Sequence, residues 1–265
     1  MDPRARHRLR VLASLERLKT DAVISHFSAA AYWGLDVWQR WPATVDVLVG
    51  GGSRSSGSFR RHTGDLDRHE TVPLGDFSVT TVAQTAVDVA LVVPFHEAVV
   101  TMDSALRRRP GGPLTTRDEL DRAVERMSGV PGSRRSRAAA AFATPLAESP
   151  LESVSRVRIM EAGFPEPRLQ EIFTDSTGFR AVVDFWWPDF GVIGEADGRL
   201  KYGGDDGADP QGARLAVIAE KNRENVLRRM SSGFARWEHA DVVRVGRLTA
   251  ILHGAGLRTM RRSPS

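Results

Sequence analysis

The sequence predicts an α/β protein of two domains, and three observations lead to this prediction. Segments rich in Val, Phe and Trp with alternating apolar residues, typical of strands, occur in both halves of the chain. Segments with helical spacing lie between and after them. A break at residues 143–149 follows a Gly- and Pro-containing stretch, and 265 residues are enough for two domains. We therefore expect an α+β module at residues 1–143 and a second domain at residues 144–265.

The composition narrows the class of protein. Hydrophobic residues make up 41% and charged residues 26% of the chain, as in soluble globular proteins. No run of about 18 apolar residues is present, so we expect no membrane partner. The basic start MDPRARHRLR lacks the apolar stretch of a secretory signal. The absence of cysteine excludes disulfides, thiolate zinc sites and cysteine nucleophiles, and it fits a cytoplasmic protein.

The positive charge is modest but clustered. The formal net charge is +4, and arginines gather near the start, in the middle and at the end of the chain. The groups are Arg4, Arg6, Arg8 and Arg10; Arg107 to Arg109; Arg134, Arg135 and Arg137; and Arg258, Arg261 and Arg262. Such clusters can neutralise the phosphates of DNA. A composition rich in Arg and Ala is also typical of GC-rich coding, so charge alone leaves a nucleic-acid partner open.

The first half shows helices and short strands in order. Leucines three apart predict a helix over 4–19 with an apolar stripe, and Gly34 is expected to end a second helix over 25–35. Pro94 separates two further helices, and Thr115 or Thr116 caps another. The remaining expected elements are strands at 44–49, 59–62, 69–72 and 77–80, a Gly/Ser-rich loop at 50–57, and helices at 82–92, 95–106, 117–127 and 134–143. Asp88 and Asp103 lie on these helices with arginines within reach, so ion pairs are expected there.

Three motifs relate this half to a known family. They are Ser25-His26-x-Ser28-Ala29-Ala30-x-x-x-Gly34-Leu35, then Val79-Thr80-x-x-x-x-Thr85-x-x-Asp88-x-Ala90, then Met102-Asp103-Ser104-Ala105-Leu106. The set resembles the AbiEi-type antitoxin domain of abortive-infection systems in its actinobacterial form, which implies a toxin partner. These are packing signatures, so His26 is expected to be a structural histidine. Only about twenty residues precede Asp21, too few for the winged helix-turn-helix with which such proteins commonly begin.

A hairpin in the second half carries the strongest signal. Residues 180–187 and 192–197 are predicted to be strands. The sequence Pro188-Asp189-Phe190-Gly191 between them is typical of a turn. If Trp187 pairs with Val192, counting back places Asp184 opposite Glu195, with Asp197 close by.

Two like charges facing each other destabilise a sheet unless a cation compensates them. A divalent metal held by oxygen ligands, Mg2+ or Mn2+, is the simplest candidate, and Lys201 is a second possible cation. The alternative is that Asp184 and Glu195 face solvent on an edge hairpin, each paired with an arginine. The residues themselves leave both interpretations open.

Motifs on either side of the hairpin extend the signal over roughly Pro145 to Leu257. Asp184 is followed by Glu195-x-Asp197-Gly198 and Lys201; Ser149-Pro150-Leu151-Glu152 opens a helix upstream; and Glu220-Lys221-x-Arg223-Glu224-x-x-Leu227-Arg228 lies on a helix before a strand at 234–237. Together they resemble the very-short-patch-repair-like branch of the PD-(D/E)XK endonucleases, which implies a mixed sheet flanked by helices. The superfamily's E-x-K pattern places Lys at 197, where this chain has Asp197.

The resemblance implies a role for each candidate residue. Asp184 and Glu195 would hold the metal, Asp197 would be a further ligand or a base, and Lys201 would stabilise charge on the phosphate. Glu152 would hold metal through water, although the box Ser149-x-x-Glu152 equally explains it as a helix cap. The candidates for contacting nucleic acid are Arg156, Arg199 and Lys221.

We therefore expect a metal-dependent DNA endonuclease, in phage defence, a toxin–antitoxin system or DNA repair. The alternative is a non-catalytic protein that binds nucleic acid or a toxin on a degenerate nuclease scaffold. Asp197 and the antitoxin-like first half favour that alternative, and a purely structural partner subunit is a third reading.

Overall fold

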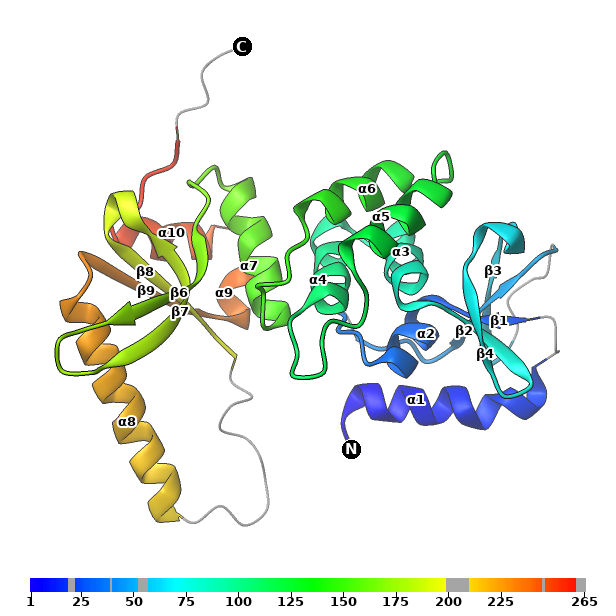
Figure 1. Cartoon of the computed structure of the whole chain (residues 1–265), viewed down its shortest axis with the longest axis horizontal. Coiled ribbons are helices and arrows are strands. Elements are labelled where there is room, and N and C mark those ends of the chain that lie inside the picture. Colours follow the sequence, from blue (N-terminus) through cyan, green and yellow to red (C-terminus); the bar gives the residue numbers. More distant parts are fainter. Residues whose placement is uncertain (19–21, 39, 52–56, 199–209, 245, 261–265) are drawn as a thin grey trace. The chain divides into compact units, whose positions relative to one another are not determined.

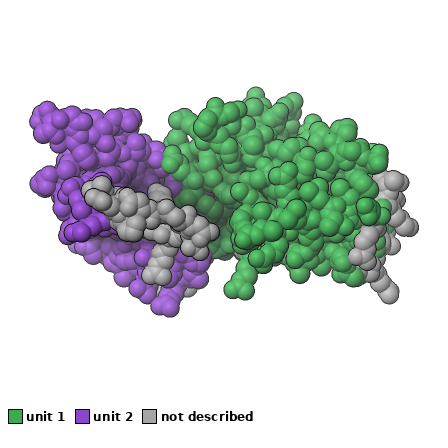
Figure 2. All heavy atoms as spheres, turned by 90° about the horizontal axis from the view of Figure 1, so that it is seen from below, with its two compact units in different colours: residues 1–150 green, residues 151–265 purple. Residues whose placement is uncertain are grey.

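The computed structural model describes residues 1–18, 22–38, 40–51, 57–198, 210–244 and 246–260. Within these ranges it contains ten α-helices and two mixed β-sheets, which confirms the predicted α/β class (Figure 1). The chain divides into two compact units, Met1–Pro150 and Leu151–Ser265 (Figure 2). No helix in the described ranges is long and apolar enough to cross a membrane.

A five-stranded sheet with strand order β3-β2-β1-β5-β4 forms part of the first unit. Its strands are β1 (Val23–Ile24), β2 (Val45–Val49), β3 (Phe59–Thr63), β4 (Thr71–Leu74) and β5 (Phe77–Thr80). β1 pairs antiparallel with β2 and parallel with β5, so it joins the two sides of the sheet. The strand predicted at 69–72 begins later, at Thr71, and β1 is missing from the prediction because two residues are too few to show alternation.

Helices of the first unit use the predicted capping and stop residues. They are α1 (Pro3–Ser14), α2 (His26–Trp33), α3 (Val82–Val92), α4 (Phe95–Leu106), α5 (Arg117–Arg126) and α6 (Ser133–Phe142), with short 3-10 helices at Leu15–Arg17 and Leu66–Arg68. Gly34 ends α2 with φ 76°, a conformation that glycine adopts readily. Thr116 caps α5, and Glu119 bonds back to the backbone of Thr116 to complete a capping box.

The buried face of α1 differs from the leucine stripe that the sequence suggested. Leu9 and Leu12 are 52% and 39% exposed, whereas His7, Val11 and Ser14 are buried. Residues three apart advance by about 300° around a helix, so a row of such leucines drifts away from any one face. The spacing of four and then three residues from His7 to Ser14 keeps those side chains together against the unit.

A buried polar cluster lies where α2 meets β2 and β3. The ring of His26 stacks on His62 at 3.5 Å, and its Nδ1 lies 2.9 Å from the hydroxyl of Ser25. The carboxylate of Asp46 bonds to both His62 and Arg60. Burial and then the neighbouring His62 lower the pKa of His26 well below its usual value. His26 is therefore a buried, hydrogen-bonded histidine, in keeping with the structural role expected for it.

Asp88 on α3 is buried against polar partners other than the arginine we expected. Its Oδ1 accepts a hydrogen bond from Gln84 Nε2 at 2.8 Å and lies 3.5 Å from His69 Nε2. Burial raises the pKa of Asp88 to about 7, and the bond from Gln84 offsets only part of this. His69 and Gln84 take the place of the expected arginine, because α3 turns this side chain into the core.

We expect the Asp88→Asn variant to be more stable than the wild type near pH 8 but not near pH 4. A raised carboxyl pKa means that the folded state binds more protons than the unfolded state between pH 3.8 and about 7. The wild type therefore loses stability as the pH rises through this window, and asparagine does not ionise. Urea unfolding at about pH 4 and pH 8 should show a gain of roughly 1–3 kcal/mol at the higher pH. The exposed Asp121→Asn on α5 is the control, and an equal gain at both pH values would contradict the assignment.

The second unit contains a four-stranded sheet with order β6-β7-β8-β9. Its elements are α7 (Pro150–Glu161), β6 (Arg168–Thr174), β7 (Arg180–Trp187), a 3-10 turn (Pro188–Phe190), β8 (Val192–Asp197), α8 (Pro210–Arg229), β9 (Gly233–Glu238), α9 (His239–Val243) and α10 (Arg247–Gly254). β6, β7 and β8 pair antiparallel, whereas β8 and β9 pair parallel. Parallel neighbours need a crossover connection, and α8 lies within it (Figure 1).

The alternation of side chains along β9 separates the two faces of this sheet. Trp237 is 1% exposed, and its Nε1 donates to the hydroxyl of Ser155 on α7 at 2.8 Å. A Cβ on Gly194 of β8 would come within 2.7 Å of the Trp237 ring, so the aromatic layer needs glycine there. Phe234 lies on the other face, in the cluster that includes Leu227 of α8. The C-terminal part of α8 therefore packs on the face on which alternate residues of β8 present their carboxylates.

Candidate active site

The β7–β8 hairpin has the predicted register. Trp187 pairs with Val192 across the tight turn, so counting back along the same register brings Asp184 level with Glu195. At this position the carboxylate of Asp184 accepts a hydrogen bond from the backbone N–H of Ala196 at 2.8 Å. The predicted register of the hairpin is confirmed from Trp187–Val192 to Phe185–Gly194, and the charge of Asp184 acts on Glu195.

Glu195 is buried and lies near the negative charge of Asp184. It is 8% exposed. Burial and then the charge of Asp184 raise its pKa to about 7, although a guanidinium lies beside it. The ion pair to Arg223 thus offsets only part of the cost of placing a second carboxylate here. A further cation would favour the ionised form of both carboxylates.

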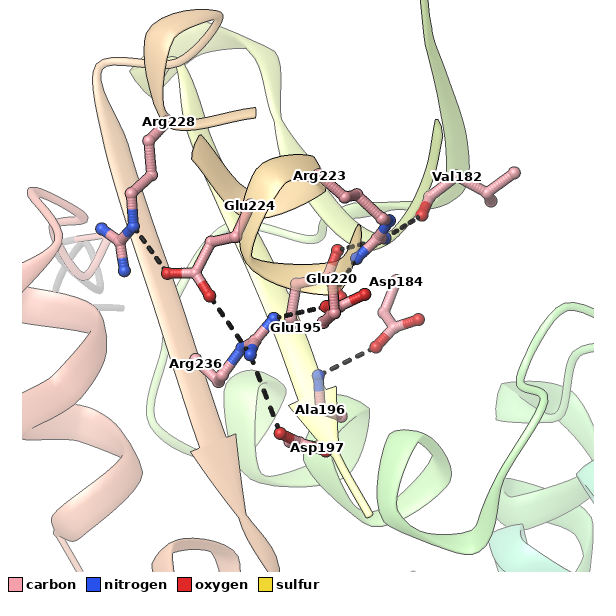
Figure 3. A network of polar contacts seen from close by, with 10 residues as sticks. All are labelled: Val182, Asp184, Glu195, Ala196, Asp197, Glu220, Arg223, Glu224, Arg228 and Arg236. Atoms are coloured by element: carbon pink, nitrogen blue, oxygen red, sulfur yellow. Dashed lines mark hydrogen bonds and ion pairs between the residues drawn. The ribbon is translucent and has the colours of Figure 1, made fainter. Parts of the chain in front are cut away.

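Arg223 reaches the pair from α8 (Figure 3). Its Nη2 lies 3.0 Å from Oε1 of Glu195 and 2.7 Å from the carbonyl oxygen of Val182 on β7. Its Nη1 lies 3.2 Å from Oε1 of Glu220, one turn earlier on the same helix. The arginine partner of the alternative interpretation is therefore present for Glu195. The rest of that interpretation is wrong for Glu195, because this side chain is buried and β7 and β8 are the two inner strands of the sheet.

Arg236 on β9 is a second cation on this face. Its guanidinium lies 3.0 Å from Glu220, 3.2 Å from Glu224 and 3.9 Å from Asp197 (Figure 3). Glu224 also accepts a hydrogen bond from Arg228 at 2.7 Å. Asp197, a predicted ligand or base, is thus held near the pair by β9.

Glu152 on α7 is anchored to the sheet by an unusual residue. It is 7% exposed, and its Oε2 accepts a hydrogen bond from Gln170 Nε2 at 3.0 Å. Gln170 has φ 53°, in the left-handed region that costs most residues roughly 1–3 kcal/mol. The β6–β7 ladder pairs Leu169 and Glu171 but skips Gln170, at the level of Asp184. The strain therefore lies beside the carboxylate pair.

Two of the remaining predicted residues, Arg156 and Lys221, lie in the described part of the chain. Arg156 on α7 is 8% exposed, which leaves little of its side chain accessible to nucleic acid. Lys221 is exposed on α8, next to Glu220 in the sequence. Lys201 and Arg199 lie outside the described residues.

The polar network of Figure 3 contains more acidic than basic side chains. Five carboxylates meet three guanidinium groups among the side chains joined in Figure 3, which leaves an excess of negative charge: Asp184, Glu195, Asp197, Glu220 and Glu224 against Arg223, Arg228 and Arg236. No group of three acidic or histidine side chains in the described ranges is placed to hold a metal ion. Mg2+ commonly needs only one or two carboxylates, with water and substrate phosphate completing its shell. Asp184 and Glu195 offer oxygen donors of the kind that such an ion prefers.

A hollow elsewhere in the second unit does not involve these carboxylates. It has a volume of about 390 Å³ and is lined by α7, α9 and α10, with Phe164, Leu248 and Leu252 at its apolar wall. The candidate site lies instead at the hairpin and α8, so we do not assign the chemistry to this hollow.

Sequence reasoning missed two residues of the network. Arg223 appears in the sequence as a partner for i,i+3 pairs on α8, and Arg236 as part of a strand, with no link to Glu195. The alternation of β9 is a usable signal for Arg236, because it places Arg236 opposite Glu195 once β8 and β9 pair. No comparable signal exists for Arg223, which depends on how α8 crosses the sheet.

Comparison with known proteins gives relatives but no function. The chain is 35% identical over 116 residues to uncharacterized proteins from two strains of Mycobacterium tuberculosis. The match covers 44% of this chain and 41% of each relative, so the chain spans less than half the length of the curated relatives it matches. No family model matches the sequence. No solved structure matches it either.

Proposed function

We propose that the second unit hydrolyses phosphodiester bonds of DNA with the help of a divalent metal. One observation carries this proposal: Asp184 and Glu195 stand side by side on neighbouring strands, with Glu195 buried to 8% exposure. Two carboxylates placed close together lower the stability of the fold unless a cation binds there. Carboxyl groups with a perturbed pKa are typical of active sites.

The order of elements supports the same proposal. Helix α7, the β7–β8 hairpin, helix α8 and strand β9 follow one another in the order in which the very-short-patch-repair-like resemblance places its motifs. The carboxylates lie on β7 and β8, and Glu152 lies on the preceding helix.

Each side chain then has a distinct role. Asp184 and Glu195 would hold Mg2+ or Mn2+, since carboxylate oxygens are the donors these ions prefer. When bound, the metal supplies Lewis-acid polarisation of the scissile phosphate and makes water more acidic. Asp197 orients the attacking water and accepts its proton at Oδ, while Lys201 offsets negative charge developing on the phosphate. Glu152, held by its bond to the side chain on β6, holds a further water.

Basic side chains of the second unit would contact the DNA backbone. We propose Arg199 and Lys221 for contacts with phosphates; Arg156, being largely buried, ranks behind them. The first unit is proposed as an AbiEi-like antitoxin-type module that binds a toxin or another component of a defence system. Salt-sensitive DNA binding is the expected signature of the phosphate contacts.

A plasmid-nicking assay tests the proposal. We expect wild-type protein to convert supercoiled plasmid to nicked or linear DNA with Mg2+ or Mn2+ but not with EDTA. The Asp184→Ala/Glu195→Ala double variant should lose this activity while circular dichroism shows an unchanged fold. Cleavage that survives in the double variant would place the chemistry elsewhere.

A second function is favoured by a specific observation. Arg223 already neutralises Glu195 at 3.0 Å, and Asp197 stands where the superfamily pattern has lysine. Both features suit a scaffold that binds nucleic acid or a toxin without cleaving. If this second function is right, the wild type should not cleave plasmid in the nicking assay. In a separate binding assay, the wild type and the Asp184→Ala/Glu195→Ala variant should bind DNA equally well and with the same sensitivity to salt.

A further inference from the structure

Arg223 occupies the position that an incoming cation needs. Its Nη2 contacts Oε1 of Glu195 at 3.0 Å and the carbonyl oxygen of Val182 at 2.7 Å. These oxygens belong to neighbouring strands, so the guanidinium bridges the hairpin (Figure 3). A carboxylate and a backbone carbonyl are oxygen donors of the kind that divalent cations prefer. Arg223 and a metal ion would therefore compete for the same atoms.

The helix offers Arg223 a second carboxylate. Its Nη1 lies 3.2 Å from Glu220, whose Oε1 also accepts a hydrogen bond from Arg236 at 3.0 Å. Arg223 can thus leave Glu195 by turning its side chain while it keeps an ion pair on its own helix. The Arg223 side chain is 26% exposed, so solvent reaches it and the movement needs no opening of the core.

We infer that Arg223 is a displaceable counter-ion that sets the affinity of the hairpin for its metal. This inference rests on the proposed function, because it assumes that Asp184 and Glu195 hold the metal. Before the metal binds, Arg223 compensates the charge of Glu195; when the metal binds, Arg223 turns toward Glu220. The apparent affinity for the metal is then lower than the carboxylates alone would give.

The test measures metal binding without DNA. Electron paramagnetic resonance of free Mn2+ gives the affinity of the wild type and of the Arg223→Gln variant. We expect Arg223→Gln to bind Mn2+ roughly tenfold more tightly, since it removes the competing charge. The matched control is Arg228→Gln: Arg228 lies on the same helix and pairs with Glu224 at 2.7 Å, so its loss should change the affinity by less than about twofold.

Two further variants guard against a folding artefact. Arg223→Lys keeps the positive charge and should bind Mn2+ nearly as weakly as the wild type. Arg223→Gln/Glu195→Gln removes both partners, should fold as judged by circular dichroism, and should lose the gain in affinity. In EDTA, Arg223→Gln should melt at a lower temperature than the wild type, and Mn2+ should restore it.

The outcomes separate this inference from the proposed function. If the wild type binds Mn2+ and cleaves DNA but Arg223→Gln leaves the affinity within twofold, the displaceable counter-ion is overturned and the nuclease stands. If neither the wild type nor Arg223→Gln binds Mn2+, the metal site itself fails. Tighter binding by Arg223→Gln alone among the single arginine variants supports the inference, whether or not DNA is cleaved.

Discussion

We expect the Glu195→Gln variant to lose metal-dependent DNA cleavage by roughly a thousandfold or more, equivalent to about 4 kcal/mol of transition-state stabilisation. The amide keeps the shape of the side chain but removes a charged metal ligand. Initial rates of plasmid nicking measure the effect. The control is Glu224→Gln, the same exchange in the same network but on α8, where Glu224 pairs with Arg228 and Arg236. That variant should retain cleavage within a few fold.

The Glu195→Gln variant should lose far less folding stability than cleavage activity. Burial and Asp184 raise the pKa of Glu195 to about 7, so its ionised form is disfavoured in the folded state. The wild type therefore loses stability as the pH rises from 4.5 to about 7, and glutamine is spared this loss. Urea unfolding near pH 8 should find the variant within about 1 kcal/mol of the wild type or more stable. Normal cleavage by Glu195→Gln would remove this residue from the active site.

The Trp237→Ala variant is expected to destabilise the second unit by about 3–5 kcal/mol. Trp237 is 1% exposed, its ring lies 5.2 Å from that of Phe185, and its Nε1 donates to Ser155. Truncation leaves a cavity between α7 and the sheet. It also removes the N–H group that donates a hydrogen bond to the hydroxyl of Ser155. Most of the loss should come from the cavity, because a single buried hydrogen bond contributes only about 1 kcal/mol.

Guanidinium unfolding followed by circular dichroism measures this loss. Trp237→Phe is the matched variant, since it keeps an aromatic ring beside Phe185 but lacks the N–H. It should lose roughly 1–2 kcal/mol, well below the alanine variant. The two units are analysed as separate transitions where the curve shows two steps. A loss below about 1 kcal/mol for Trp237→Ala would contradict the buried position of this ring.

Local signals determined much of the fold. Pro94 separates α3 from α4, whose bounds match the prediction, and Gly34 ends α2 where a glycine stop was expected. The hairpin was predictable for the same reason. Its turn and its alternating residues are adjacent in the sequence, so they fix the register and bring Asp184 to the level of Glu195.

Features with weak local signals in the sequence were not predicted correctly. β6 is half-exposed along most of its length and includes the left-handed Gln170, so its sequence lacks clean alternation. β1 has only two residues and becomes a strand because β2 and β5 pair with it. The leucines of α1 suggested a face that the packing does not use, since burial selects His7, Val11 and Ser14.

The sequence by itself determined which carboxylates meet, and only the tertiary structure decided what compensates them. Asp184 and Glu195 are joined by one tight turn, so the period of a strand is enough to place them together. Arg223 reaches Glu195 from a helix that packs on the sheet, and Arg236 lies opposite Glu195 on a strand that pairs parallel with β8. The position of Arg223 depends on how α8 lies over β8, through contacts such as that of Leu227 with the core cluster. The position of Arg236 depends on the pairing of β9 with β8. Spacing along the chain carries no record of that packing.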